Sequence, residues 1–222
     1  MNSAQSWSPR TRVIRFAPST VGDYQAVHAL QQRLLAARIA GGDDLLLIGE
    51  HERVVTLGRA TPQPWPVLPI PVVPIERGGQ ATWHGPGQLV AYPIVSLKDL
   101  GIGVREYMRA LETAVIAALL RFCLVAQRRE GATGVWVGEQ KIASMGVAVR
   151  RSVTWHGVAL NVSPDLSDFA LIQPCGFAPT VMTSMAKQLG TAPPMEAVVD
   201  ALILELVRAL DLAPPVREPL PA

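Results

Sequence analysis

The chain has 222 residues, of which 49% are hydrophobic and 17% are charged, and its formal net charge is +2 at pH 7. This composition indicates a well-packed globular core and excludes a disordered chain, and the small net charge gives no sign of a general nucleic-acid binder. Two cysteines cannot make a disulfide framework, and the longest apolar run, residues 113–120, is too short to cross a bilayer. Because the N-terminal segment also has no apolar core of signal-peptide length, we expect a soluble cytoplasmic protein with reduced thiols.

The N-terminal third predicts a strand, a helix and two further strands. Residues 11–17 are typical of a strand, and a helix follows in which Thr20 and Asp23 have capping-box spacing and Gly41 and Gly42 mark the end. The helix carries an apolar stripe made of Tyr24, Val27, Leu30, Leu34 and Leu35. Two β-rich runs, 44–50 and 53–59, predict adjacent strands around His51.

Residues 61–74 carry six of the nineteen prolines, which predicts a loop or an extended edge and not a helix. Residues 89–97 predict another strand. A long helix is expected over 104–124, where Cys123 continues an apolar repeat of four residues and should therefore be an inert, buried thiol.

The C-terminal half predicts a hairpin over 135–149, a strand over 153–162 and a helix over 195–211. The proline-rich tail, 214–222, should be frayed. Strands and helices do not alternate regularly, so we expect one α/β (α+β) domain over residues 1–222, with a mixed sheet flanked by helices.

Three stretches carry residues suited to chemistry. The first, residues 76–92, holds four glycines, Arg77 and His84 between two strands. Glycines allow a close approach of the backbone to a ligand, an arginine can anchor a charged group, and a histidine can move a proton. A glycine-stabilised turn around a satisfied histidine explains the composition equally well. The spacing matches neither a Walker loop nor a dinucleotide fingerprint.

The second stretch is the predicted hairpin, in which a regular strand places Lys141 on one face with Met145, Val147 and Val149. If that face is inward, desolvation lowers the pKa of the lysine, whereas a nearby thiolate would raise it. A lysine beside a hairpin turn is more commonly solvated.

The third stretch, residues 170–177, places Cys175 between a proline and a glycine, as on a turn. A nucleophilic thiol needs a base or a cation that lowers its pKa. The candidate partners are Lys141, His84, His51 and His156, and periodicity does not choose among them.

Together these stretches resemble the lipoyl(octanoyl) transferase family of lipoate biosynthesis. The resemblance rests on RGGQATWHGPGQLVAYP (77–93), in which Trp83 stands where tyrosine is commoner, and on HERVVTLGR (51–59), GVWVGEQKIASMG (134–146), VTWHGVALNV (153–162) and LIQPCG (171–176). It covers residues 45–190, apart from the proline-rich insert, and implies a fold similar to the biotin and lipoate protein ligases.

The resemblance also implies the roles of individual residues. Cys175 would be the nucleophile that forms an acyl thioester, and Lys141 its partner. His51 and His84 fall in matching blocks and would lie close to the sulfur. The residues that would line the substrate site are Arg77, Gly78, Gly79, Gln80, Ala81, Thr82, Trp83, His84, Ser144, Met145, Gly146, Gly157, Val158 and Ala159.

The implied activity is the transfer of an octanoyl group from octanoyl-acyl carrier protein to a lysine of lipoyl domains, in 2-oxoacid dehydrogenases and the glycine cleavage H protein. No cofactor, metal, nucleic acid or membrane is implied, because the acyl group arrives on the phosphopantetheine of the carrier, and the family leans to monomers. Three alternatives share parts of the pattern: an ATP-dependent lipoate ligase, a thiol hydrolase of cysteine–histidine type, and a non-catalytic binder of lipoyl domains or acyl carrier protein.

Overall fold

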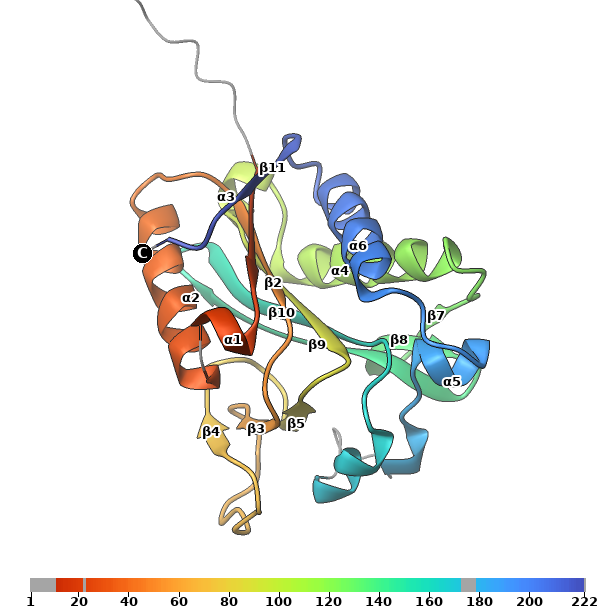
Figure 1. Cartoon of the computed structure of the whole chain (residues 1–222). Helices are drawn as coiled ribbons and strands as arrows, with labels where there is room; N and C mark the ends of the chain where they lie inside the picture. The colour runs from red at the N-terminus through yellow and green to blue at the C-terminus, as the bar shows by residue number, and fades with distance from the viewer. Residues whose placement is uncertain (1–10, 22, 173–178, 222) are drawn as a thin grey trace, which may run out of the picture.

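A computed structural model describes residues 11–21, 23–172 and 179–221. These residues form an eight-stranded sheet and a three-stranded sheet (Figure 1). In spatial order, the large sheet consists of β11 (Pro215–Glu218), β1 (Thr11–Phe16), β2 (Leu45–Gly49), β6 (Gln88–Ile94), β10 (Val153–Asn161), β9 (Gln140–Arg150), β8 (Ala132–Val137) and β7 (Gln127–Arg129). The pairs β11–β1 and β1–β2 are parallel and the others are antiparallel, which confirms the mixed sheet.

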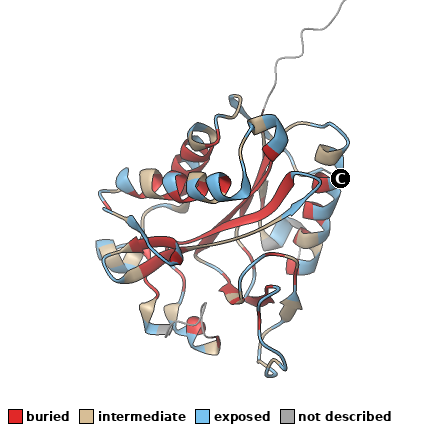
Figure 2. Ribbon diagram, turned by 180° about the vertical axis from the view of Figure 1, so that it is seen from behind, coloured by how far each residue is buried: buried red, intermediate tan, exposed pale blue. Residues whose placement is uncertain are grey.

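Helices cover both faces of the large sheet (Figure 1). On one face, α4 (Val104–Leu120) and α6 (Met195–Ala209) pack against each other and against a core cluster that includes Val13, Leu89 and Val158. On the other face, α2 (Tyr24–Ile39) contributes Val27, Leu30, Leu34 and Leu35 to a second cluster. The strands between these layers are mostly buried, as Figure 2 shows, and the fold is the expected α/β (α+β) fold.

The small sheet has the order β4 (Val72–Pro74), β3 (Val54–Leu57) and β5 (Ala81–His84). The prediction that 44–50 and 53–59 are adjacent strands is therefore wrong, because β2 and β3 belong to different sheets. The chain passes His51 between them and changes sheet there. The proline-rich segment contains no helix and ends in the edge strand β4, as expected from prolines, which cannot donate to a central ladder.

The remaining helices are short. Among the described residues they are α1 (Pro18–Val21), α3 (Leu97–Leu100), α5 (Met185–Leu189) and two 3-10 segments, Leu166–Leu171 and Pro179–Val181. The cap of α2 differs from the capping box expected for Thr20 and Asp23. Asp23 is itself the N-cap and accepts a hydrogen bond from the backbone N–H of Ala26, while Thr20 belongs to α1.

Cys123 does not lie in the core, which corrects the prediction of a buried thiol. Helix α4 ends at Leu120, and Cys123 is exposed in the following turn with φ +60°. The backbone N–H of Leu124 donates to the carbonyl of Leu119 over 3.1 Å, and Leu124 takes the buried position instead. The apolar repeat holds only while the chain is helical, so it cannot be extended past this end.

The C-terminal tail is also ordered where fraying is predicted. Strand β11 pairs in parallel with β1, from Thr11 opposite Pro215 to Ile14 opposite Glu218. Pro215 is tolerated because it opens an edge strand, where a missing N–H costs little. The Arg12 Nε atom also donates to Glu218 Oε2 over 2.6 Å. In the described part of the chain, no helix is both long and apolar enough to span a membrane.

Candidate active site

A hollow lies between the α2 side of the large sheet and the small sheet. Its walls come from α2, the segment before β5, β5 itself, and the strands β6, β9 and β10. The lining residues are Tyr24, Ile75, Arg77, Gly78, Gly79, Thr82, His84, Tyr92, Ser144, Met145, Gly146, His156, Gly157, Val158 and Ala159. The lining is largely apolar, with a few polar groups, as is common in sites that bind small molecules.

The structure brings most of the proposed substrate-site residues to this hollow. Gln80, Ala81 and Trp83 are the exceptions. Successive side chains of β5 point to opposite faces, so Thr82 and His84 face the hollow while Ala81 and Trp83 pack in the cluster of Phe169 and Ile172. Gln80 contributes its carbonyl, which accepts a hydrogen bond from Arg77 Nη1 over 2.7 Å.

Four lining residues, Tyr24, Ile75, Tyr92 and His156, have no place in the substrate site expected from the sequence. Tyr24 lies on the helical stripe and Tyr92 in an apolar strand, so both resemble core residues. The sequence offers His156 only as a candidate partner of the thiol. The hydroxyl groups of tyrosines at otherwise apolar, buried positions are the signal that could have identified these two residues.

Arg77 holds the turn that forms one wall. Its guanidinium is buried and donates to the carbonyls of Gly78, Gln80 and Thr56, and also to the Thr56 hydroxyl. A Cβ on Gly146 would lie 2.8 Å from Arg77 Cδ, so this glycine lets the turn pack on β9. The backbone N–H of Gly78 donates to the carbonyl of Val147 over 3.0 Å.

Lys141 is turned toward the hollow side of the sheet by an irregularity in β9. Val135 pairs with Ala143, and the next residue, Trp136, pairs with Lys141, so Ile142 is an extra residue in β9. An extra residue reverses the alternation of side chains that follows it. Lys141 therefore shares the face of Ser144, not that of Met145 and Val147, and the prediction for a regular strand is wrong.

Lys141 is buried, with 3% of its surface exposed, so the solvated alternative is excluded. Its Nζ atom lies 5.7 Å from the centre of the Trp136 ring, a cation–π distance. The neighbouring Gly134 has φ +130°, and a Cβ there would lie 2.5 Å from Lys141 Cε. The glycine therefore provides both the backbone conformation and the space for the lysine.

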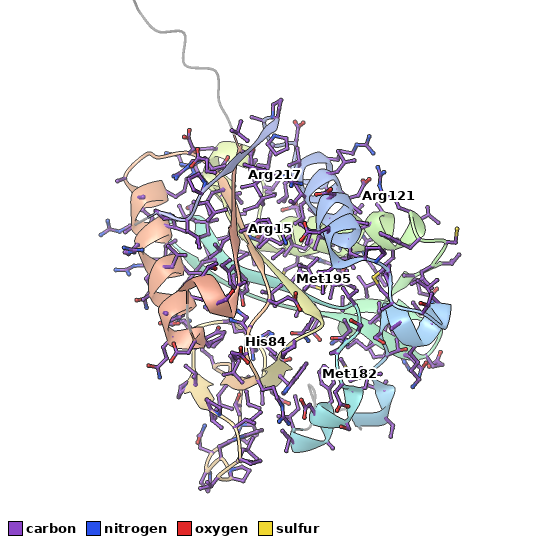
Figure 3. The ribbon with its side chains drawn as sticks, viewed as in Figure 1. Arg15, His84, Arg121, Met182, Met195 and Arg217 are labelled. Atoms are coloured by element: carbon purple, nitrogen blue, oxygen red, sulfur yellow. The ribbon has the colours of Figure 1, made fainter. Side chains whose placement is uncertain are left out.

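A chain of hydrogen bonds connects His84 in the hollow with the backbone of Lys141 (Figure 3 labels His84, at the lower end of the molecule). His84 Nδ1 lies 2.7 Å from the amide oxygen of Gln88, and the Gln88 amide nitrogen donates to Asn161 Oδ1 over 2.9 Å. Asn161 Nδ2 donates to the carbonyl of Thr183, whose own N–H donates to the carbonyl of Lys141. Each amide both donates and accepts, so the chain fixes these groups relative to one another.

Burial keeps the histidines of the site neutral. Desolvation is the largest cause that lowers the pKa of His84, to about 4, although its contact with Gln88 acts in the opposite direction. Desolvation likewise lowers the pKa of His156 to about 3, and it holds the pKa of His51 well below its usual value. His51 Nε2 lies 2.7 Å from the hydroxyl of Tyr92. Near neutral pH these rings can therefore accept protons only weakly.

Cys175 lies outside the described residues, so its place as a nucleophile stays a prediction. Both described flanks of its segment pack near the site. Ile172 contacts the cluster of Trp83, and Met182 pairs with Lys141 in an isolated parallel bridge. Met182 is labelled in Figure 3 at the same end of the molecule as His84.

Comparisons with known proteins agree with these features. The model of the lipoyl protein ligase A/B catalytic domain family matches residues 23–207. An octanoyltransferase from Chloroflexus aggregans is 46% identical over 205 residues, which cover 86% of this chain and 92% of that protein.

Solved structures share the fold at low identity. Lipoate-protein ligase A bound with ATP superposes with a TM-score of 0.78 at 17% identity, covering 97% of this chain and 90% of that chain. Biotin protein ligase from Aquifex aeolicus, in complex with biotin and ATP, gives a TM-score of 0.56 at 12% identity, covering 91% and 68%. Identities this low support a common fold and no shared activity.

Proposed function

Because the chain belongs to the lipoyl protein ligase A/B catalytic domain family and is an acyltransferase that moves octanoyl groups in protein lipoylation, we propose a two-step reaction through Cys175. Octanoyl-acyl carrier protein is the donor, and a lysine of a lipoyl domain is the acceptor. Lys141 is the partner of the thiol, and no further cofactor takes part.

In the first step the thiolate of Cys175 attacks the carbonyl carbon of the donor thioester. A new carbon–sulfur bond forms, the bond to phosphopantetheine breaks, and the leaving thiolate takes the proton of the Lys141 ammonium, which becomes a neutral amine. One thioester replaces another, so the acyl group stays activated without ATP. In the second step the acceptor amine attacks, the amide bond forms, and the thiolate of Cys175 is released.

The proposed role of Lys141 uses both charge states of its amine. As an ammonium it stabilises the thiolate, and as a neutral amine it takes the proton from the acceptor lysine. Burial favours the neutral form, while a thiolate partner favours the charged form. The observation that supports this role best is the extra residue in β9, which turns Lys141 to the hollow face beside Met182, seven residues after Cys175.

The hollow suits the acyl chain. Apolar surfaces of Met145, Val158 and Ala159 line it, and burial of an eight-carbon chain contributes about 5 kcal/mol at about 0.8 kcal/mol per methylene. The residues proposed to contact the substrate are those of the predicted set that line the hollow. Acyl carrier proteins are acidic, so the exposed Arg150 and Arg151 at the β9–β10 turn are proposed as part of their docking surface.

The test is to mix the protein with octanoyl-acyl carrier protein and to weigh it by mass spectrometry. We expect one octanoyl adduct that hydroxylamine removes and that Cys175→Ala abolishes. Cys123→Ala is the matched control and should keep the adduct, because Cys123 is exposed in a turn after α4. An adduct on Cys123 would instead remove Cys175 from the mechanism.

Two further arms separate the alternatives. Free octanoate with ATP should give no acylated lipoyl domain, whereas an ATP-dependent ligase would produce it and would tolerate Cys175→Ser. A hydrolase would release octanoate from the donor without an acceptor. Lys141→Ala should fold and show little turnover, and full activity of this variant would exclude the lysine from the reaction.

The proposal also retains the cytoplasmic location and the monomeric state expected from the sequence.

A further inference from the structure

Three side chains that the proposed transfer does not require meet beside the hollow. They are His28 from α2, Glu76 from the segment before β5, and His156 from β10. Nε2 of His28 lies 3.0 Å from Oε2 of Glu76, and Nε2 of His156 lies 3.8 Å from the same oxygen. All three ligand atoms lie within 4.8 Å of one another.

One ring nitrogen of His156 is buried and unpaired among the described residues, which the contacts within this group do not explain. The residue is 2% exposed, and its Nε2 atom has no hydrogen-bond partner among the described residues. The distance of 3.8 Å to Glu76 is too long for a hydrogen bond. A buried polar atom without a partner is costly, and a bound ion or water is one way in which a native fold satisfies it.

The backbone fixes this nitrogen in place. His156 has φ +55°, a backbone conformation that residues other than glycine rarely adopt. Its backbone N–H donates to Gln31 Oε1 over 3.1 Å. The ring also lies 4.4 Å from the ring of Trp155 and 5.8 Å from that of His28, measured between centroids. A strained backbone held by a buried hydrogen bond is typical of a residue whose direction matters.

We propose that His28, Glu76 and His156 bind a divalent transition-metal ion of the Zn²⁺ class. Two imidazoles and one carboxylate suit zinc, whereas Mg²⁺ and Ca²⁺ prefer oxygen ligands. Zinc–ligand bonds of about 2.0–2.2 Å in a tetrahedron place neighbouring ligand atoms roughly 3.3 Å apart. The two measured distances, 3.0 and 3.8 Å, lie on either side of this value.

The charges around the group are compatible with a cation. Burial lowers the pKa of His156 to about 3, so its imidazole is neutral near neutral pH, the form that binds a metal. Glu76 supplies a carboxylate with 39% of its side chain exposed, which gives the ion a path from solvent. Arg77 and His84 also act on His156, and the positive charge of Arg77 opposes the ion and limits its affinity.

A bound ion would join α2, the segment before β5, and β10, which together form much of the wall of the hollow. The site would keep a fourth position for water, as zinc sites with three protein ligands do. Since the ion binds the folded chain, it should also raise the melting temperature.

The test uses the full chain and three ions. Zn²⁺ should bind with a stoichiometry of one per chain at this site in calorimetry, and Mg²⁺ should not bind measurably. Co²⁺ separates this site from the cysteines, because nitrogen and oxygen ligands give visible bands without the near-ultraviolet charge-transfer absorption of a thiolate. A Co²⁺ complex that shows only thiolate absorption would overturn the proposal.

Two variants and one control locate the ion. Glu76→Gln and His28→Gln keep the side-chain size at partly exposed positions, and each should weaken Zn²⁺ binding by about tenfold or more and abolish its effect on the melting temperature. Glu139→Gln changes an exposed carboxylate that pairs with Arg129 and should leave both quantities unchanged. Equal Zn²⁺ affinity in the wild type and in both variants would refute the site, and none of these readouts depends on acyl transfer.

Discussion

Replacement of Gly134 by alanine tests whether the position of Lys141 is needed for acyl transfer. Gly134 has φ +130°, a region that essentially only glycine occupies. A Cβ at this position would lie 2.5 Å from Lys141 Cε and 2.6 Å from the carbonyl oxygen of Ala143. The substitution therefore strains the backbone and pushes the lysine at the same time.

The two effects can be estimated separately. Backbone strain at such a position costs about 1–3 kcal/mol, and insertion of one methyl group into a filled space costs about 1–3 kcal/mol more. Gly134→Ala should therefore lower the free energy of unfolding by about 2–6 kcal/mol. Displacement of a reacting group by about 1 Å can slow a reaction roughly 100-fold, so we expect a loss of that size in the rate of acyl transfer.

Gly138→Ala is the matched control in the same hairpin. Gly138 has φ +56°, but nothing lies within 4 Å of its Cβ position, so only the backbone cost of about 1–2 kcal/mol applies. Unfolding in urea measures the stability of both variants, and single-turnover transfer to a lipoyl domain measures the rate below the unfolding transition. If Gly134→Ala transfers octanoyl groups as fast as Gly138→Ala, the placement of Lys141 does not limit the reaction and the reasoning fails.

Three other predictions concern pH, chain length and docking. The pKa of His84 is about 4 in the folded chain and about 6.5 in the unfolded chain, so below pH 6.5 the unfolded chain binds the extra proton. The free energy of unfolding should therefore fall by about 2 kcal/mol for this histidine between pH 7 and pH 5, and urea titrations of His84→Gln should show a correspondingly smaller fall. Ala159→Val places added methyl groups on the wall of the hollow and should lower kcat/KM for octanoyl-acyl carrier protein about 4- to 15-fold relative to a butanoyl donor; an unchanged ratio would mean that the acyl chain lies elsewhere. Joint replacement of Arg150 and Arg151 by alanine should raise KM for octanoyl-acyl carrier protein about tenfold at low salt but leave octanoyl-pantetheine unaffected, and an equal effect on both donors would contradict docking through these exposed arginines.

The sequence predicts the elements well where the pattern of side chains is repeated. The stripe of α2 and the apolar strands β6 and β10 are found as expected, because burial on one or both faces leaves a regular signal. The sequence predicts that the glycine-rich run at 76–92 and the hairpin carry chemistry, and residues of both line the same hollow. That both belong to one site follows from the family resemblance, since local patterns contain no information about contacts between distant strands.

The predictions that fail do so at ends and irregularities. Continuing the apolar repeat past the last turn of α4 places Cys123 in the core, and closeness in sequence predicts that β2 and β3 pair; the structure shows neither. Pairing of β11 with β1 joins segments about two hundred residues apart, and composition cannot reveal such a contact. In each case the deciding interaction is a backbone hydrogen bond, which leaves little trace in the side chains.

The site depends on one such irregularity. Without the extra residue at Ile142, strict alternation would direct Lys141 toward α4 and α6, into a core of aliphatic side chains, where an ammonium would be desolvated without a partner. With the extra residue, Ile142 and Ala143 both enter that core, and Lys141 reaches the opposite face beside Trp136 and Gly134. The burial of Ile142 thus stabilises the bulge that directs the lysine, and the glycine prevents a clash that would reverse it. Packing of Ile142 and Ala143 on one face of the sheet therefore determines where Lys141 lies on the other face.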